Sequence, residues 1–219
     1  LDFTVLHGLP CYVHPDLRRF PAVVTMHDLQ HLHLPENFTP ADIATREREY
    51  RESCQQADHV ICVSEFTRQD VHQRYGIPLD KLTTIWNLPP HTQHVGLSDQ
   101  AIGVLLARMN IAEPYFYYPA QPWLHKNHAA LLEAMVLLDT RLPPRVKLVL
   151  TGQPFTADHP ATPLLEDARL RGRAVHLGYR SPAEVAVLYH RAIAMVFPSR
   201  FEGFGLPLIE AMQHRCPIV

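Results

Sequence analysis

FPSRFEGFGLPLIE, the stretch from Phe197 to Glu210, decides how this chain is interpreted. It continues a short apolar run at residues 193–197, which is typical of a buried strand. Pro207 then opens a helix, because proline is favoured at the first helical position. The stretch is therefore expected to link the carboxyl end of a strand to the amino end of a helix, where parallel sheets bind their ligands.

This loop has the residues that a diphosphate site needs. Gly203 and Gly205 have no Cβ, so the backbone can approach a ligand closely. The backbone N–H groups of Phe204, Gly205 and Leu206 can point at an anion, and the helix dipole adds to the attraction. An anion can be held in this way without a metal ion.

Two carboxylates in the stretch lie eight residues apart. Glu202 is in the loop, and Glu210 is about one turn into the helix, where it can accept two hydrogen bonds from a ribose diol. The spacing predicts that both line one wall of a cleft. An isolated pair of this kind is usually a solvated loop charge and a first-turn carboxylate favoured by the dipole. The whole string favours the binding interpretation.

Strands and helices alternate along the chain. Apolar runs predict strands, and N-cap residues such as Thr39, Ser64 and Ser181 predict helix starts. Strands are expected at residues 22–26, 59–63, 82–86, 115–118, 146–150, 174–177 and 193–197, and helices at 40–56, 65–74, 98–109, 127–139, 162–171, 182–191 and 207–214. This alternation indicates parallel βαβ units. Residues 87–97 contain Pro89, Pro90 and Gly96 and are the best linker candidate. The sequence predicts an α/β protein with two doubly wound domains, residues 1–96 and 97–219.

The composition is that of a globular protein without a polyanion-binding surface. The 219 residues are 47% hydrophobic and 19% charged, with a net charge of -2, so nucleic acid is not an expected partner. Four cysteines form no C-x-x-C pair, and no apolar run approaches the ~20 residues that span a bilayer. We expect reduced thiols in a cytoplasmic protein; peripheral membrane contact and the oligomeric state stay open. Because the chain starts and stops in strand-like runs, we expect it to be truncated at both ends.

The stretch at 197–210 resembles the E-x7-E signature of retaining glycosyltransferases with the GT-B fold, in particular family 4. Three further motifs of that family precede this stretch, in the same order as in the family. They are VTMHDL at 24–29, ICVSEFT at 61–67 and YPAQPWLHKNH at 118–128. The resemblance covers nearly the whole chain and implies two Rossmann-like domains that face a cleft.

The resemblance also implies roles for individual residues. A nucleotide sugar would bind to the second domain, and a glycan or lipid-linked acceptor mainly to the first. Glu210 would hold the ribose and Glu202 the hydroxyls of the transferred sugar. Lys126 would neutralise the departing diphosphate, and His27 would reach across the cleft to the sugar.

One position departs from the family pattern. Many relatives have an arginine five residues before the lysine, and this chain has Gln121 there. Either Arg200, Lys126 and the loop amides suffice for the diphosphate, or it is held more weakly. The form of residues 118–127 resembles a subgroup associated with mannosyl transfer in bacterial surface polysaccharides, which makes GDP-mannose a candidate donor.

The chemistry expected from these residues needs no cofactor besides the donor. Departure of a nucleoside diphosphate leaves negative charge, which a fixed lysine and oriented amides stabilise best where water is excluded. The chain has no Asp-x-Asp motif, so a metal-bridged diphosphate is not indicated. The family resemblance implies retention of the anomeric configuration. We therefore expect a metal-independent, retaining hexosyltransferase.

Three alternatives compete with this interpretation. His27, His31 and His33 lie close together, and the first two have the spacing of metal ligands on one helix face, but the segment follows a strand and leads into Pro35. A sugar-nucleotide epimerase of the same architecture would interconvert free sugar nucleotides. A truncated, non-catalytic nucleotide-binding module would bind nucleotide without releasing sugar.

Overall fold

The computed structural model describes residues 5–8, 11, 20–89, 98–111, 114–138, 141–143 and 146–219. The chain forms two compact units. Unit 1 contains Leu1–Leu88 together with Phe201–Gly205, and unit 2 contains Pro89–Arg200 and Leu206–Val219. The predicted boundary between residues 96 and 97, and most of the predicted linker, lie outside the described residues.

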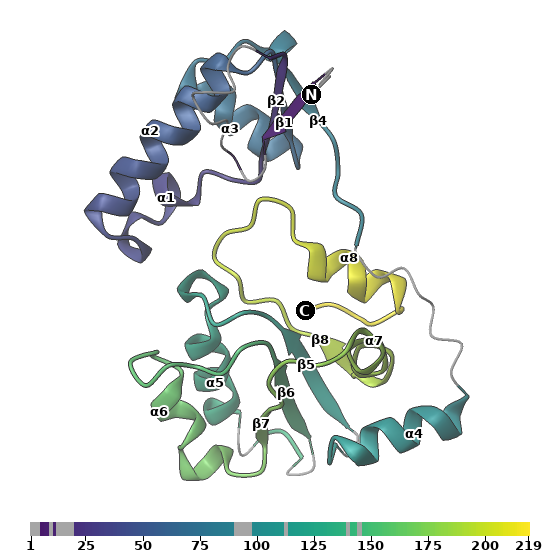
Figure 1. Ribbon diagram of the computed structural model, residues 1–219. Coiled ribbons are helices and arrows are strands. Elements are labelled where there is room, and N and C mark those ends of the chain that lie inside the picture. Colours follow the sequence, from purple (N-terminus) through teal and green to yellow (C-terminus); the bar gives the residue numbers. More distant parts are fainter. Residues whose placement is uncertain are drawn as a thin grey trace. The chain divides into compact units, whose positions relative to one another are not determined.

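Unit 1 is built on a parallel sheet with its strands in sequence order (Figure 1). The strands are β1 (Leu6–Gly8), β2 (Ala22–Met26), β3 (His59–Cys62) and β4 (Leu82–Thr84). The side chains of Val24, Met26, Val60 and Cys62 are fully buried in the core of the unit. The strands predicted at 22–26, 59–63 and 82–86 are thus confirmed, although β3 ends one residue early and β4 two residues early.

The helices of unit 1 begin where their caps predict. In α2 (Pro40–Gln56), the side chains of Thr39 and Asp42 each accept a hydrogen bond from the other's backbone N–H, which forms a capping box. Before α3 (Glu65–Tyr75), the Ser64 side chain accepts from the N–H of Thr67. The short helix α1 (Gln30–His33) and the 3-10 turns Pro35–Asn37 and Leu79–Lys81 were not predicted, because one turn leaves no periodic pattern.

Unit 2 has a second parallel sheet, in the order β7-β6-β5-β8. Its strands are β5 (Tyr115–Pro119), β6 (Lys147–Thr151), β7 (Ala174–His176) and β8 (Ala194–Met195). Near the end of the chain, Ile218 forms a parallel bridge with Met195. The chain adds β6 and β7 on one side of β5 and then returns to place β8 on its other side. This is the doubly wound topology that the alternation of elements predicts.

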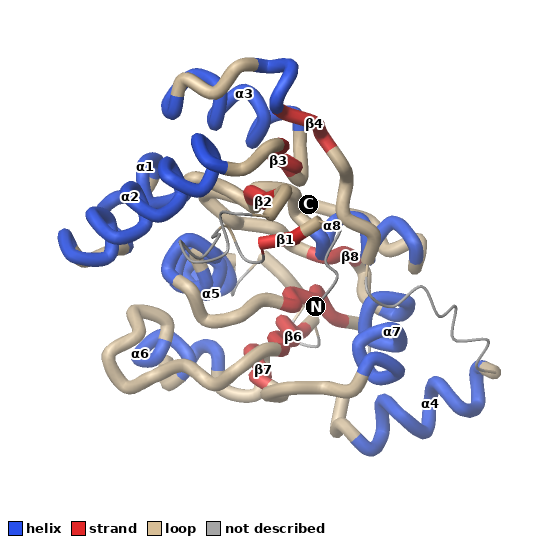
Figure 2. Tube along the Cα trace, turned by 45° about the horizontal axis from the view of Figure 1, so that its top comes forward, coloured by secondary structure: helices blue, strands red, loops and turns tan. Residues whose placement is uncertain are grey.

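Helices cover both faces of the second sheet (Figure 2). One apolar cluster joins Tyr117 and Val149 to α4 (Asp99–Arg108), α7 (Pro182–Arg191) and α8 (Leu206–Gln213). The other joins Tyr118, Leu148 and Leu150 to α5 (His128–Leu137) and α6 (Thr162–Leu165). Neighbouring strand residues alternate between these clusters, so the strands are apolar on both faces, as parallel sheets require.

The predicted helix at 162–171 is wrong in its second half. Helix α6 stops at Leu165, and a separate 3-10 turn covers Ala168–Leu170. The carboxylate of Asp167 accepts a hydrogen bond from the backbone N–H of Arg169 at 2.8 Å, and such a local bond competes with helix continuation. A further 3-10 turn at Leu124–Lys126 precedes α5.

The described residues bear on two expectations from the composition, which concern membrane-spanning helices and the state of the cysteines. None of the helices in them is both long and apolar enough to cross a bilayer. The four cysteines are free and buried, and burial raises the pKa of the Cys11 thiol to about 11.

Candidate functional site

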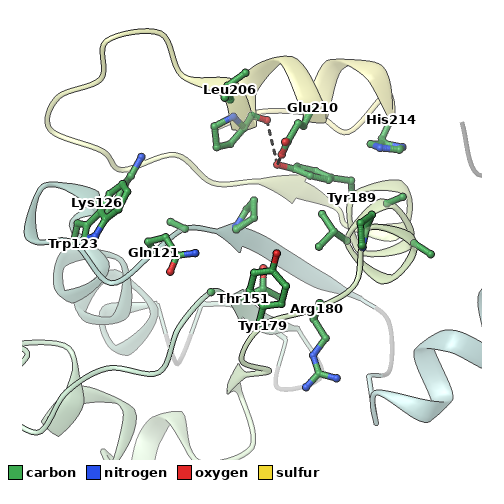
Figure 3. A pocket seen from close by; sticks show the side chains of 18 residues that line it. Gln121, Trp123, Lys126, Thr151, Tyr179, Arg180, Tyr189, Leu206, Glu210 and His214 are labelled. Carbon is green, nitrogen blue, oxygen red and sulfur yellow. Dashed lines mark hydrogen bonds between the residues drawn. The ribbon is translucent and has the colours of Figure 1, made fainter. Parts of the chain in front are cut away.

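Unit 2 contains a pocket of about 720 Å³ beyond the carboxyl ends of β5 and β6 (Figure 3). Its wall is formed by the loops after β5, β6 and β7 and by one side of α7 and α8. Residues that line it include Gln121, Trp123, Lys126, Thr151, Gly152, Tyr179, Arg180, Tyr189, Leu206, Glu210 and His214. This is the position at which doubly wound sheets bind ligands.

The first two loops of the wall are held together by close backbone contacts. Gly152 follows β6 with a φ of +134°, and a Cβ on it would lie 2.3 Å from the carbonyl oxygen of Ala120. Its N–H donates to the carbonyl oxygen of Gly178 at 3.2 Å, which joins the loop after β7. Only glycine suits this position, because any side chain would push the loops apart.

Gln121, which stands where a cation was expected, has a fixed side chain. Its Oε1 atom accepts a hydrogen bond from the backbone N–H of Gln153 at 3.2 Å. This bond leaves the amide nitrogen on the pocket side, where Figure 3 shows it. The residue therefore offers neutral N–H donors to a ligand, and no charge.

Lys126 lies in the same wall, at the end of the Leu124–Lys126 turn. The residue is buried, and its ammonium nitrogen lies 5.9 Å from the centre of the Trp123 ring, a cation–π contact (Figure 3). The Tyr118 hydroxyl donates to the Lys126 carbonyl oxygen at 2.7 Å. The backbone below the lysine is thus anchored to the core.

The Lys126 loop is bonded to the start of the E-x7-E stretch. The backbone N–H of Arg200 donates to the carbonyl oxygen of His125 at 2.8 Å. The side-chain amide of Asn127 donates to the carbonyl oxygen of Pro198 at 3.2 Å. These bonds join two segments about seventy residues apart in the sequence into one wall.

Glu210 projects into the pocket from α8. Its Oε2 atom accepts a hydrogen bond from the Tyr189 hydroxyl at 2.9 Å, drawn in Figure 3. Burial is the main cause, and the nearby Glu210 carboxylate the second cause, that raises the pKa of the Tyr189 phenol far above its usual value. Tyr189 therefore stays protonated and remains a donor to the carboxylate.

The residues predicted to bind the donor divide into two groups. Lys126, Leu206 and Glu210 line this pocket. Arg200, Gly203, Phe204 and Gly205 are not among its lining residues, and Arg200 is exposed. Gly152, Arg180 and Tyr189 are among the residues of the wall that sequence reasoning missed. An isolated glycine after a strand hints at a close backbone approach, but a tyrosine within a helix reads as an ordinary core residue.

Arg180 brings a second cation to the wall of the pocket. Its Nε donates to the carbonyl oxygen of Leu177 at 3.0 Å, and its Nη1 lies 3.7 Å from Glu184. The guanidinium is thus engaged by its own loop and by the first turn of α7.

His27 and Glu202 belong to unit 1. His27 follows β2 and is exposed, and Glu202 is half-buried. In this unit Gly203 packs on the backbone of His27, since a Cβ on Gly203 would lie 1.9 Å from the His27 carbonyl oxygen. The Thr67 hydroxyl lies 3.3 Å from that oxygen. The joint action of His27 and Glu202 with the residues of unit 2 stays a prediction.

The other histidines of the VTMHDL region contact separate carboxylates. His31 Nε2 lies 3.4 Å from Glu47 in α2, and His33 Nε2 lies 2.7 Å from Asp70 in α3. In the part of the chain that the structure describes, no group of three or more His, Cys, Asp or Glu residues is placed to hold a metal ion.

A cluster of imidazoles packs behind the loop after β5. The buried ring of His128 contacts the rings of Tyr118, Phe155 and His159, with centroids 4.9, 5.0 and 6.1 Å away. Burial is the main cause, and the neighbouring His159 the second cause, that lowers the pKa of His128 to about 3. The imidazole is therefore neutral in the folded protein at ordinary pH.

The chain matches two family models and several curated relatives. Residues 110–219 match the family described as "Glycosyl transferases group 1", and residues 2–88 match "Glycosyltransferase Family 4". O-antigen chain mannosyltransferase B of Escherichia coli is 30% identical over 98% of this chain and 56% of its own length. O-antigen chain mannosyltransferase RfbU of Salmonella typhimurium is 24% identical over 90% of this chain and 50% of its own length. The chain thus spans about half the length of these relatives.

Solved structures with a similar fold include Anabaena HepE in complex with UDP, with a TM-score of 0.76 and 20% identity over 99% of this chain and 59% of that one. Sucrose-phosphate synthase of Thermosynechococcus elongatus has a TM-score of 0.77 and 23% identity, over 99% of this chain and 55% of that one. These likenesses confirm the predicted GT-B fold. Since the group 1 model covers half of the chain and the family 4 model most of the remainder, the chain belongs to the group 1 glycosyl transferases.

Proposed function

We propose that this chain is part of a metal-independent, retaining hexosyltransferase that uses a nucleoside-diphosphate sugar. The observation that carries the proposal is the pocket of unit 2, where Lys126 and Glu210 project from different elements into one cavity (Figure 3). A cation suits a diphosphate, and a carboxylate suits the two hydroxyls of a ribose. The pocket thus offers one group that suits each part of a nucleoside diphosphate, the diphosphate and the ribose.

The proposal gives roles to three residues of the wall and to two residues of unit 1. Glu210 accepts hydrogen bonds from the ribose hydroxyls. Lys126 stabilises the negative charge that grows on the diphosphate as the sugar leaves, and its buried position strengthens this effect. Gln121 supplies neutral donors to the same phosphates. His27 and Glu202 act on the transferred sugar.

We extend the proposal to mannose as the sugar, GDP-mannose as the donor and a glycan or lipid-linked glycan as the acceptor. Two relatives are named O-antigen chain mannosyltransferases, which supports this choice. Anabaena HepE was solved with UDP, so the uridine nucleotides are the competing donors to test. The four free, buried cysteines fit a cytoplasmic protein, which a lipid-linked acceptor would bring to the inner face of the membrane.

Thermal unfolding with added nucleotides tests the donor. A ligand present at 100 times its Kd and bound only to the folded state adds about 2.7 kcal/mol to the free energy of unfolding. We expect GDP and GDP-mannose to raise Tm, and Glu210→Ala to remove most of that rise. Measurement of sugar transfer from GDP-mannose to an O-antigen-type glycan then tests the reaction itself. No stabilisation by any nucleotide, or interconversion of the free sugar nucleotide, would overturn the proposal.

A further inference from the structure

The hydroxyl of Tyr189, in α7, meets α8 in the wall of the pocket. It is 2.9 Å from Glu210 Oε2 and 3.3 Å from the carbonyl oxygen of Pro207 (Figure 3). The whole residue is fully buried, and it lies in the wall of the pocket. The one polar atom of its side chain therefore reaches the pocket wall through its contact with the Glu210 carboxylate.

The ring of Tyr189 is held on two sides. The Tyr117 ring meets it edge-on, with centroids 5.0 Å apart and an interplanar angle of 83°. The His214 ring is stacked on it, at 5.6 Å and 10°. Tyr117 is itself fixed by the bond between its hydroxyl and Thr151 Oγ1, 2.8 Å long. The Tyr189 hydroxyl is thus a fixed donor, since the ring that carries it cannot swing away.

A fixed donor matters for a glutamate, whose long side chain loses rotamer freedom when it is held in one place. A carboxylate oxygen has two acceptor sites, so Oε2 can accept from Tyr189 and from a ligand hydroxyl together. The phenol cannot take a proton from the carboxylate or lose its own near neutral pH. It therefore orients Glu210 without altering its charge.

We propose that Tyr189 is a positioning residue for ribose recognition, and that its hydroxyl holds the Glu210 carboxylate in the orientation that receives the two ribose hydroxyls. This inference rests on the proposed function, in which Glu210 binds the ribose. Because the oriented group acts on the diol, loss of the Tyr189 hydroxyl weakens the binding of nucleotides that have a diol and spares those that lack it.

The test compares GDP with 2′,3′-dideoxy-GDP by calorimetry on the full chain. We expect Tyr189→Phe to weaken GDP binding about 10- to 150-fold, the effect of one hydrogen bond to a charged group, and to leave the binding of the dideoxy nucleotide nearly unchanged. In a Glu210→Ala background, Tyr189→Phe should have no further effect on GDP.

Tyr115→Phe is the matched control. The Tyr115 hydroxyl is also buried in unit 2 and donates to the Leu188 carbonyl oxygen at 3.0 Å. Its loss should lower Tm as much as Tyr189→Phe does but leave the ratio of the two affinities unchanged. Tm measurements on all variants confirm that they are folded.

The outcomes separate this inference from the proposed function. If Glu210→Ala weakens GDP selectively but Tyr189→Phe behaves like Tyr115→Phe, or weakens both nucleotides equally, the positioning role is wrong and the donor site stands. If Glu210→Ala leaves the affinity ratio unchanged, the assignment of Glu210 to the ribose fails, and the role of Tyr189 fails with it.

Discussion

The side chain of Gln121 is tied to the backbone of Gln153 by a hydrogen bond of 3.2 Å from the Gln153 N–H to Gln121 Oε1. An arginine at position 121 has no acceptor and could not form this bond. The glutamine therefore joins the loops after β5 and β6, while it leaves the pocket with one cation fewer than the family pattern implies. A change at this position should affect diphosphate affinity more than fold.

Gln121→Arg should tighten GDP binding about 5- to 20-fold, because it adds a charged donor beside Lys126. Guanosine, which has no phosphate, should bind as before. Calorimetry with both ligands measures the difference. Gln153→Ala is the control, since only its backbone takes part in the bond and its exposed side chain is not a lining residue. An equal gain for guanosine would contradict a phosphate contact.

Lys126→Ala should slow sugar transfer more than it weakens donor binding. The charge on the diphosphate is greatest as the sugar leaves, so a fixed cation stabilises the transition state more than the bound donor. We expect kcat to fall about 100- to 1,000-fold, the effect of removing one such group, and GDP affinity to fall far less. Single-turnover transfer and calorimetry measure the two quantities. Lys147→Ala, at the opposite end of β6, should change neither.

Gly152→Ala should destabilise unit 2 and reduce donor binding with it. The new methyl group would lie 2.3 Å from the Ala120 carbonyl oxygen, at a φ of +134° that alanine rarely adopts. We expect Tm to fall by several degrees, since about 1 kcal/mol corresponds to 2–4 °C in a chain of this size. Gly103→Ala is the matched control: its Cβ meets nothing within 4 Å in α4, so Tm should rise slightly.

His128 should make the protein sensitive to acid. Its pKa of about 3 in the folded state is below the ordinary value of 6.5. Between these two pH values the unfolded chain binds a proton at His128 and the folded chain does not. The contribution of neutral His128 to the free energy of unfolding is therefore fully present above pH 6.5, and it is lost as the pH falls from there toward 3. The loss is about 2 kcal/mol at pH 5.

Urea unfolding of the wild type and of His128→Gln at pH 7 and pH 5 checks this effect. The variant should lose about 2 kcal/mol less than the wild type between the two values. His190→Gln, at an exposed position, should lose as much as the wild type. A wild type and a His128→Gln variant with parallel pH profiles would disprove the assignment.

Features encoded by neighbouring residues were predictable from the sequence. Thr39 and Ser181 each begin a capping box, and both helix starts are confirmed at the residue expected. Apolar runs located the central strands for the same reason, because burial on both faces leaves a continuous signal in the sequence. The motif strings placed Lys126 and Glu210, which the structure brings to one pocket.

Features that depend on distant residues were not predictable. Nothing near Tyr189 in the sequence indicates that its hydroxyl meets a carboxylate on the next helix. The need for glycine at position 152 arises from Ala120, on another strand's loop. The break after α6 is a local feature, but it depends on whether one carboxylate bonds to a backbone N–H two residues on, which helix propensity alone does not decide.

The bonds from Arg200 to His125 and from Asn127 to Pro198 have a consequence for protein engineering. A chimera that imports the loop at 123–127 from a relative, but keeps residues 198–200, would lose the side-chain bond if it replaced Asn127, and a loop of different backbone course would move the His125 carbonyl oxygen away from the Arg200 N–H. The preference for a donor should therefore be transferred between relatives only when residues 123–127 and 198–200 are exchanged together.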